Sequence, residues 1–301
     1  DFFNKKLLEY YKWTKEVKGI IKTEKPDVVH FLYGDVFYKY FGLGLEGLKK
    51  KHKVVNTIHA LKKGKIGIVS LKRIMHLSSV GVVHTDAIFN EVKDAGIENV
   101  VHIEYPHFST GYDIDKAGAR KHYGLSENAF VLGCIGGTRY DKGLDILLKA
   151  LRSVTGDFEL LVAGAEDAIK REEIEELARP YRDRVKLHLS FLTDEEFEMA
   201  IQAVDAIVLP YRKTFNGASG PLGEGVAKGK IIIAANHGSL GDIVEKNHLG
   251  YTFESENIEA LKKVLNMAIQ RTNYTYDEKA NAYKNKLSIN EFKKQYCKLY
   301  F

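Results

Sequence analysis

The residue types best suited to bind an anion are concentrated in residues 130–143, FVLGCIGGTRYDKG. An apolar run ends there at Gly136 and Gly137, the cations Arg139 and Lys142 follow, and an apolar helical pattern begins at once. Glycine lets the backbone approach a ligand closely, and a helix N-terminus offers unpaired N–H groups and a positive dipole end. The segment therefore suits a diphosphate. Taken alone, it is equally compatible with an ordinary strand–helix turn that carries two solvated cations.

A second segment, residues 205–234, has a similar pattern. A buried strand is followed by a helix that we expect to begin at Ser219 and Gly220, both favourable N-cap residues, with Pro221 in the first turn. Glu224 lies one turn into this helix, within reach of ribose hydroxyls beside a bound anion. In an isolated helix, a favourable interaction with the helix dipole would be the better explanation of this acid. Because both segments end at the same edge of one predicted sheet, we favour the ligand.

Strand and helix patterns alternate along the chain, which indicates parallel sheets. Helical stretches are expected at 4–24, up to about 51, at 66–77, at 87–96, between the later strands and from 257 to 301. Strands are expected at 27–33, 53–59, 80–85, 99–105, 129–135, 158–163, 185–189, 205–210 and 230–234. Ligands of such sheets bind beyond the carboxyl ends of the strands.

The predicted fold class is α/β, with two doubly wound domains in tandem that face each other across a cleft. Residues 106–117 are rich in Pro, Gly and polar residues and are the predicted linker. The expected domains are residues 1–108 and residues 109–287, with a last helix at 288–301 that crosses back to the first domain. The chain opens directly on a helical pattern, so we expect the first domain to be incomplete at its start.

Composition limits the class of protein. The 301 residues are 45% hydrophobic and 28% charged, with no run long enough to span a bilayer and no signal-peptide pattern. The two cysteines, Cys134 and Cys297, lie far apart in apolar patterns, which favours buried thiols in a reducing compartment. Ten Lys or Arg and one acid, Glu46, lie between Val36 and Thr85. This is either a solvated basic face or a surface for anionic lipid headgroups or a phosphorylated acceptor, whereas nucleic acid is disfavoured.

Two motifs are interpreted as chance matches. Gly42–Gly47 fits the pattern GxGxxG but neither directly follows a strand nor precedes an acidic ribose reader, which argues against a dinucleotide-dependent oxidoreductase. Asp113 and Asp115 resemble a metal-binding DxD motif but lie in the polar linker. No set of His, Cys, Asp and Glu has metal-ligand spacing. The remaining histidines that could attract attention are assigned to packing or to the surface, namely His102, His107 and His188.

The order of several motifs is more specific than any one of them. GGTRYDKGLDILLKAL, LLVAG, VDAIVLPY and SGPLGEGVAKGKIIIAANHGSLGDIV follow one another, preceded by KPDVVHFL, NTIHA and VGVVHTDAIFNEV. On these segments the chain resembles the GT-B glycosyltransferases, and among them the retaining, family-4-like enzymes (glycosyl transferases group 1). The resemblance covers most of the chain and is strongest from Phe130 to about Leu265.

The resemblance implies roles for particular residues. Arg139 and Lys142 would bind the donor diphosphate and stabilise the leaving group without a metal, Glu224 would hold the ribose, and His59 would line the cleft near the transferred sugar. A buried structural role for His59 remains open. Base selectivity is expected around residues 188–191. The expected catalytic residues are His59, Arg139 and Lys142, and the expected donor-binding residues are Gly136, Gly137, Arg139, Lys142, Asn216, Ser219, Gly220, Pro221, Leu222 and Glu224.

Two departures from the family pattern leave alternatives open. The first glutamate of the family's two-glutamate motif is replaced by Asn216, which can form hydrogen bonds but carries no charge. The opening strand and Gly-rich loop of the family are not found before Asp1. The expected function is hexosyl transfer from a nucleotide-diphosphate sugar to a hydroxyl acceptor, with no bound cofactor. The alternative is a non-catalytic nucleotide-binding or partner subunit of the same fold.

The acceptor and the setting are predicted only in outline. The basic part of the first domain suggests a cytoplasmic enzyme, peripheral at the inner face of an anionic membrane. The acceptor would then be lipid-linked or part of a cell-surface polysaccharide or glycolipid.

Overall fold

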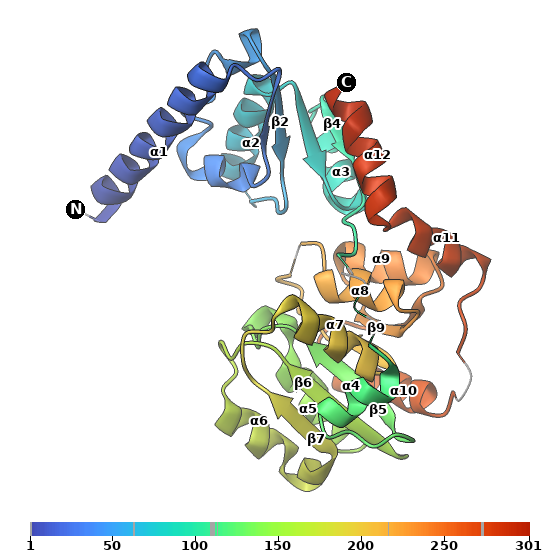
Figure 1. Ribbon diagram of the computed structural model, residues 1–301. Helices are drawn as coiled ribbons and strands as arrows, with labels where there is room; N and C mark the ends of the chain where they lie inside the picture. The colour runs from blue at the N-terminus through green and yellow to red at the C-terminus, as the bar shows by residue number, and fades with distance from the viewer. Residues whose placement is uncertain (1, 63, 109–111, 113, 216, 272–273) are drawn as a thin grey trace. The chain divides into compact units, whose positions relative to one another are not determined.

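The computed structural model describes residues 2–62, 64–108, 112, 114–215, 217–271 and 274–301 (Figure 1). The chain divides into two compact units. Unit 1 comprises residues 1–104 and 294–301, and unit 2 comprises residues 105–293.

Unit 1 is built on a four-stranded sheet. The strands β1 (Val28–Phe31), β2 (Lys53–Thr57), β3 (Val80–Val83) and β4 (Val100–His102) are all parallel and lie in sequential order. The α-helices α1 (Phe2–Glu24), α2 (Lys65–Leu77) and α3 (Asp86–Asp94) belong to this unit. Each contributes apolar side chains to one core, in which Phe37, Ile74 and Val92 are almost completely buried.

The helical stretch predicted up to about residue 51 is wrong, because the structure has no α-helix in residues 34–51, all of which it describes. Two short 3₁₀ helices, η1 (Gly34–Tyr40) and η2 (Leu48–Lys50), flank a series of turns that contain the GxGxxG match. Gly44 has a φ of +99°, and a Cβ placed on it would lie 2.6 Å from Cγ2 of Thr14. The glycine is therefore explained by a close approach to α1 and not by a nucleotide.

Helix α12 (Ile289–Tyr300) ends in unit 1, where it packs on the sheet through two tyrosines. The Tyr300 hydroxyl lies 2.7 Å from Nδ1 of His30, and the Tyr296 hydroxyl lies 3.3 Å from Oγ1 of Thr57. Nε2 of His30 lies 2.8 Å from the same Thr57 oxygen. Burial lowers the pKa of His30 to about 4, so the imidazole is neutral in this network at physiological pH.

Unit 2 is built on a six-stranded parallel sheet in the order β10-β9-β8-β5-β6-β7. The strands are β5 (Phe130–Ile135), β6 (Phe158–Ala163), β7 (Val185–His188), β8 (Ala206–Leu209), β9 (Ile231–Ala235) and β10 (Gly250–Phe253). Strands β5 to β7 run outward to one edge, and β8 to β10 run outward to the other. The strand order therefore reverses between β5 and β8, and a reversal of this kind is where open α/β sheets bind their ligands.

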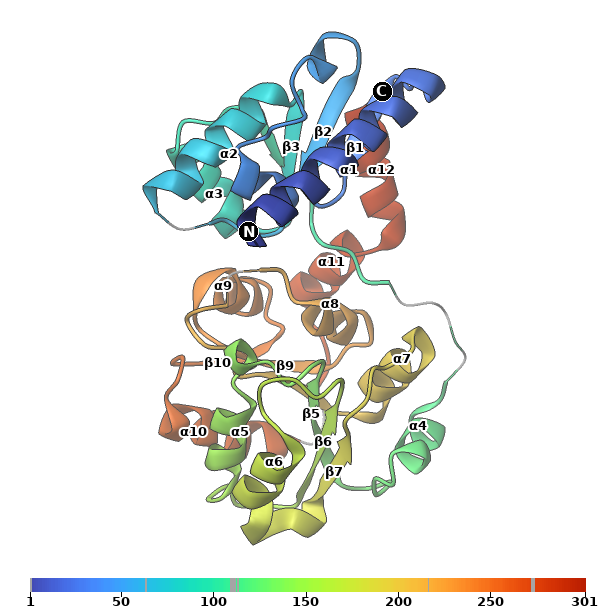
Figure 2. The ribbon, with the colours of Figure 1, turned by 90° about the vertical axis from the view of Figure 1, so that its left-hand side faces the viewer.

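Helices cover both faces of this sheet, because alternate residues of each strand point to opposite sides. Val131 and Ile135 of β5 belong to a core with α4 (Lys116–His122), α7 (Asp194–Ala203), α8 (Gly220–Ala227), α9 (Gly238–Lys246) and α11 (Glu278–Lys286). Leu132 and Cys134 belong to the opposite core, with α5 (Leu144–Leu151), α6 (Arg171–Ala178) and α10 (Ile258–Ile269). Figure 2 shows α5, α6 and α10 on one side of the strands and α4 and α7 on the other.

Strand β10 was not among the expected strands. It has only four residues and pairs with β9 alone, at an edge of the sheet. Gly250 opens it with a φ of +151°, and a Cβ there would lie 2.2 Å from the Ile232 carbonyl oxygen. The Gly-Tyr-Thr-Phe sequence has strand-forming residues, but it is too short to show a period.

Candidate functional site

The loops that follow β5 and β8 lie on either side of the reversal in strand order, and they pack directly against each other. Gly143, at the end of the first loop, has a φ of +65°, and a Cβ on it would lie 2.0 Å from the carbonyl oxygen of Pro210 in the second. Only glycine allows this approach. The sheet thus brings the two predicted anion-binding segments to one place within unit 2.

The turn after β5 is shaped by contact between two glycine backbones. Gly136 has a φ of +112° and donates its N–H to the Ala163 carbonyl at 2.7 Å. Gly164 has a φ of +144°, and a Cβ on it would lie 2.3 Å from the Gly136 carbonyl carbon and oxygen. The N–H of Thr138 is bonded to Ala165, whereas the N–H of Gly137 has no partner among the residues that the structure describes. A donor in this turn is thereby left for a ligand.

Lys142 lies over this glycine turn. A Cβ placed on Gly136 would be 2.5 Å from Nζ of Lys142, and the same ammonium lies 5.9 Å from the centre of the Tyr211 ring. No carboxylate lies within 4.0 Å of it in the described part of the chain. Burial lowers the pKa of Lys142, and the nearby Arg139 guanidinium lowers it further. Within the described residues, Lys142 is therefore a largely buried cation that has no carboxylate in direct contact, although the more distant Asp141 raises its pKa somewhat.

Arg139 is arranged differently. Its Nε lies 2.9 Å from Oδ1 of Asp141, and a second bond joins the two side chains in a bidentate pair. The hydrogen bond from Arg139 lowers the pKa of Asp141, and half of the arginine side chain is exposed. Among the described residues, Arg139 is paired with a carboxylate and Lys142 is not. Arg139 must therefore exchange Asp141 for a phosphate to act as predicted.

The N-terminus of α8 forms the facing wall. Ser219 is the N-cap, and its Oγ lies 3.2 Å from the Tyr211 hydroxyl. Cγ of Pro221 is 4.0 Å from the position that a Cβ on Gly136 would occupy, so the helix start adjoins the glycine turn and Lys142. One expectation fails here. The N–H groups of Leu222 and Gly223 do not point freely at an anion, because they are bonded to the side chain and carbonyl of Ser219.

Glu224 is buried in α8 and is held by the chain segment that enters unit 2. One of its carboxylate oxygens accepts the backbone N–H of Phe108 at 2.5 Å. Burial raises the pKa of Glu224. The carboxylate is therefore already engaged on one side, a contact that the sequence did not indicate. Asn216, the other polar residue predicted to hold the donor, lies outside the described residues.

His59 belongs to unit 1 and follows β2. Its Nε2 lies 2.8 Å from the Leu32 carbonyl, its ring stacks on Tyr33 at 5.0 Å, and its backbone N–H is bonded to Asp35 at 3.1 Å. The side chain is half-buried, and its ring is 5.1 Å from that of His84. His59 is thus oriented by its surroundings at the carboxyl edge of the sheet.

The sequence analysis missed a buried ion pair between the two loops. Arg212, two residues beyond Pro210, makes two bonds of 3.0 Å to the carboxylate of Asp145 in the first turn of α5, and both side chains are buried. From sequence alone, an arginine in a loop is expected to be exposed to solvent. The only available signal was an aspartate in an otherwise apolar helix, LDILLKAL, where burial calls for a partner.

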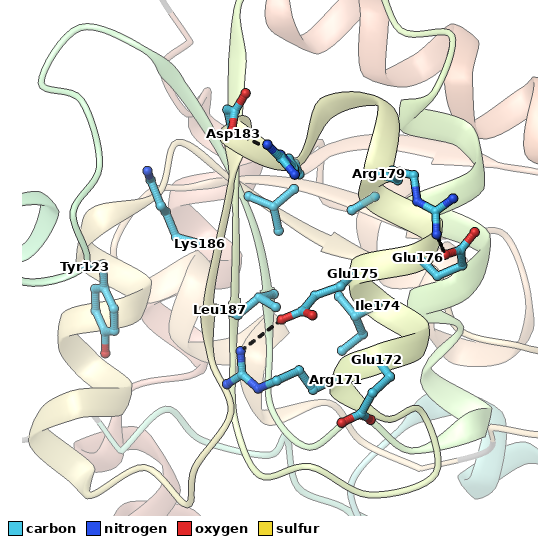
Figure 3. A pocket seen from close by; sticks show the side chains of 13 residues that line it. Tyr123, Arg171, Glu172, Ile174, Glu175, Glu176, Arg179, Asp183, Lys186 and Leu187 are labelled. Atoms are coloured by element: carbon cyan, nitrogen blue, oxygen red, sulfur yellow. Dashed lines mark hydrogen bonds and ion pairs between the residues drawn. The ribbon is translucent and has the colours of Figure 1, made fainter.

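A cavity of about 770 Å³ lies elsewhere in unit 2, beside the edge strand β7 (Figure 3). Its charged side chains come from α6, from the 3₁₀ helix that follows it (Arg179–Arg184) and, for Lys186, from β7, and several of them are paired with one another. Arg171 lies 3.5 Å from Glu175, and Arg179 is bonded to Glu176. None of the predicted site residues lines this cavity, and we do not assign the donor to it.

A family model described as "Glycosyl transferases group 1" matches residues 115–286, which is more than half of the chain. The chain belongs to this family. The resemblance found in the sequence is confirmed at this level. The narrower assignment to the retaining, family-4-like group stays a prediction.

Relatives of known structure confirm the fold of this family member. Sucrose-phosphate synthase from Thermosynechococcus elongatus is 16% identical, with a TM-score of 0.77 over 96% of this chain and 76% of that one. Anabaena HepE, solved with UDP, is 18% identical, with a TM-score of 0.78 over 94% and 80% of the two chains. The fold is GT-B, with a Rossmann-like parallel sheet in each unit.

A curated relative is more similar in sequence. The glycogen synthase of Rhodopseudomonas palustris (strain BisB18) is 25% identical over 236 residues. The match covers 72% of this chain, which spans 45% of the glycogen synthase. None of the helices in the described part of the glycosyltransferase chain is both long and apolar enough to cross a bilayer.

Proposed function

We propose that this chain is a retaining, metal-independent glycosyltransferase. It moves a hexose-type unit from a nucleotide-diphosphate sugar to a hydroxyl acceptor. The observation that carries the proposal is the Lys142 ammonium, which lies over the glycine turn, next to the start of α8 and without a carboxylate partner within the described residues. A diphosphate placed there would supply the missing negative charge.

The chemistry follows from this placement. The bond between the anomeric carbon and the diphosphate oxygen breaks and charge develops on the departing diphosphate. The acceptor oxygen forms its new bond on the same face of the sugar, and its proton passes to the departing diphosphate oxygen. The Lys142 ammonium and the Gly137 N–H, which has no partner within the described residues, stabilise that charge. Electrostatic catalysis is most effective when such groups are already in position and need not reorganise during the reaction. Arg139 joins them when phosphate replaces Asp141, and Glu224 binds the ribose with the carboxylate oxygen that Phe108 does not use. We place His59 beside the transferred sugar, on the acceptor side.

The comparisons support a nucleotide-diphosphate donor. HepE has been solved with UDP and with UDP-glucose, and it shares the fold of this chain. A thermal-shift screen across nucleoside diphosphates tests this part of the proposal, because a ligand that binds only the native state raises the unfolding temperature. Failure of every nucleoside diphosphate to stabilise the protein would contradict the proposal.

Retention and metal independence need a turnover assay. The full-length protein should transfer sugar in the presence of EDTA, and NMR of the product should show the anomeric configuration of the donor. An inverted product would contradict the retaining mechanism. Binding of nucleotide without transfer or release of sugar would instead support a non-catalytic partner subunit, the alternative that Asn216 motivates.

The membrane setting is proposed from one surface of unit 1. The outward face of α2 exposes three aliphatic side chains, Ile66, Ile68 and Val69, of which Ile66 is 75% exposed. Lys65, Lys72 and Arg73 lie on the same exposed side of the helix. An exposed helix face on which aliphatic side chains alternate with cations suits the interface of an anionic bilayer. Such a surface would bring the enzyme to a lipid-linked acceptor in polysaccharide or glycolipid synthesis.

Sedimentation with liposomes tests the membrane proposal independently of catalysis. We expect binding to vesicles that contain phosphatidylglycerol and much weaker binding to pure phosphatidylcholine. The Ile66→Ser and Val69→Ser double variant should lose this preference, whereas Ile20→Ser, an exposed change on α1, should keep it. Equal binding to both kinds of vesicle would exclude the proposed role of this face.

A further inference from the structure

We infer that Arg212 and Asp145 are positioning residues that set the place of Lys142 and thereby the preference of the site for a diphosphate. The inference rests on the proposed function for its consequence, but its geometry is independent of it. Arg212 comes from the loop after β8 and Asp145 from the first turn of α5, so the pair joins the two sides of the reversal in strand order.

Arg212 contacts the whole turn that carries Lys142. Its backbone N–H is bonded to the Asp141 carbonyl at 2.9 Å, and Nη1 is bonded to the Tyr140 carbonyl at 3.1 Å. Its guanidinium carbon lies 4.0 Å from the centre of the Tyr140 ring. Together with the two bonds to Asp145, these contacts involve both residues immediately before Lys142 and the helix that follows it.

The residue next to Arg212 reaches the N-terminus of α8. Tyr211, the neighbour of Arg212, is buried and bonds the N-cap Ser219 through its hydroxyl, and its ring faces the Lys142 ammonium. The side chains of residues 211 and 212 therefore connect α8, Lys142 and the β5–α5 turn. A shift of Arg212 would change the distance between the ammonium and the helix start.

Stability alone does not account for this pair. A buried ion pair is costly to desolvate, and apolar side chains of similar size commonly replace one without loss of stability. Although burial by itself would raise the pKa of Asp145, the bonds from Arg212 keep it below its usual value, so the carboxylate remains charged and available to the guanidinium. A planar guanidinium that forms two parallel hydrogen bonds with a carboxylate is fixed in its orientation as well as in its distance from that carboxylate. The single ammonium group of lysine cannot be fixed in this way.

The same unit offers a matched control at the opposite edge of the sheet. Arg120 of α4 is buried and its Nη2 lies 2.6 Å from Asp205, which directly precedes β8. This pair also joins a helix to a strand end, but at the amino edge of the sheet, away from the turn after β5. Arg212→Lys and Arg120→Lys therefore each remove a buried guanidinium that contacts a carboxylate, with two bonds to Asp145 in the first case and one bond to Asp205 in the second.

The first readout does not require any ligand. Limited acetylation of the full chain, followed by mass spectrometry, gives the labelling rate of Lys142 relative to that of the exposed Lys246. We expect Arg212→Lys to change this ratio at least about threefold and Arg120→Lys to leave it unchanged, because the exposure and pKa of Lys142 depend on the turn that Arg212 holds. An unchanged ratio in Arg212→Lys would overturn the inference, whether or not the protein binds nucleotides.

The second readout links the pair to specificity. For the wild type, the ratio of the dissociation constant of UMP to that of UDP measures the preference of the site for a second phosphate. This preference should fall about tenfold in Arg212→Lys and remain in Arg120→Lys, since small displacements of a charged group reduce its interaction steeply. If Arg212→Lys does not fold, the apolar pair Arg212→Met with Asp145→Leu replaces it. A folded variant that retains the full preference contradicts the inference, whereas a wild type that binds neither nucleotide contradicts the proposed function.

Discussion

The polar side chains at the carboxyl edges of the two sheets differ in the partners that they contact. In unit 1, Asp35 accepts the backbone N–H groups of His59 and Ala60, and the buried His84 is bonded through Nδ1 to the Ile103 carbonyl. In unit 2, the Lys142 ammonium faces a glycine backbone and an aromatic ring and no described carboxylate. The Asp35 and His84 side chains of the first edge are thus bonded by protein groups, whereas the Lys142 ammonium of the second has no carboxylate partner among the described residues.

Overall charge does not explain this difference, because it runs the opposite way. Unit 1 has 20 Lys or Arg and 12 Asp or Glu, whereas unit 2 has 25 and 28. The uncompensated cation thus lies in the unit with more acids than bases. Its acids are engaged elsewhere, such as Asp141 with Arg139 and Asp145 with Arg212. The location of charge within the fold, and not its sum, distinguishes the proposed donor site.

The largest effect is expected from Lys142→Met, which removes the cation that defines the unit 2 edge. Turnover of the nucleotide-sugar donor should fall by about 10²–10³-fold, the usual loss for one preorganised group that stabilises developing charge. The unfolding temperature should stay equal or rise, because the lowered pKa of Lys142 shows that its charge is unfavourable in the folded protein without ligand.

The matched control is Lys246→Met on α9, an exposed lysine near Asp242. It should leave both turnover and unfolding temperature unchanged. If Lys142→Met lowers the unfolding temperature and reduces turnover only in proportion to unfolded protein, the ammonium has a structural role and the contrast between the two edges fails.

The local sequence was sufficient to predict most helices and strands and the glycine turn after β5. It was not sufficient to predict which residues the charged side chains contact. The runs around β5 and β8 are apolar enough to be read directly, and Gly136 and Gly137 mark a turn by type. Arg139 and Arg212 have the same chemistry in the sequence, yet one pairs with a residue two positions away and the other with Asp145, 67 residues away. Which cation remains free depends on such tertiary pairings, so the prediction of two equal diphosphate ligands could not have been refined from the sequence.

A second prediction concerns how the unit 2 turn is preformed. Gly164→Ala should destabilise the protein by about 2–3 kcal/mol, because a Cβ there would overlap the Gly136 backbone and its φ of +144° is unfavourable for alanine. Gly96→Ala in unit 1, with a φ of +78° and open space around it, should cost about 1 kcal/mol. Chemical denaturation measures both. Equal losses would mean that packing of the two glycine backbones does not stabilise the turn.

A smaller effect is expected at the unit 1 edge. His59→Ala removes a half-buried ring that is already held by Leu32 and Tyr33. If the ring also contacts the transferred sugar, kcat should fall about tenfold, the equivalent of one hydrogen bond, with the affinity for UDP unchanged. His76→Ala, an exposed change on α2, should have no effect. Loss of UDP affinity in His59→Ala would contradict the assignment of this residue to the acceptor side.

The smallest effect is a pH dependence that separates the two cations of the turn. The pKa of Lys142 is lowered by burial and by Arg139, so its ammonium loses its proton at a lower pH than an ordinary lysine. The affinity for a nucleoside diphosphate should therefore be full while Lys142 is protonated and decrease as the pH rises through its lowered pKa. Isothermal titration calorimetry with UDP between about pH 8 and about pH 10, where the phosphates no longer titrate, should show a several-fold decrease. In Lys142→Arg, whose guanidinium stays charged throughout, the affinity should decrease only as far as deprotonation of the uracil of UDP lowers it. A decrease as large as that of the wild type would assign the titration to another group.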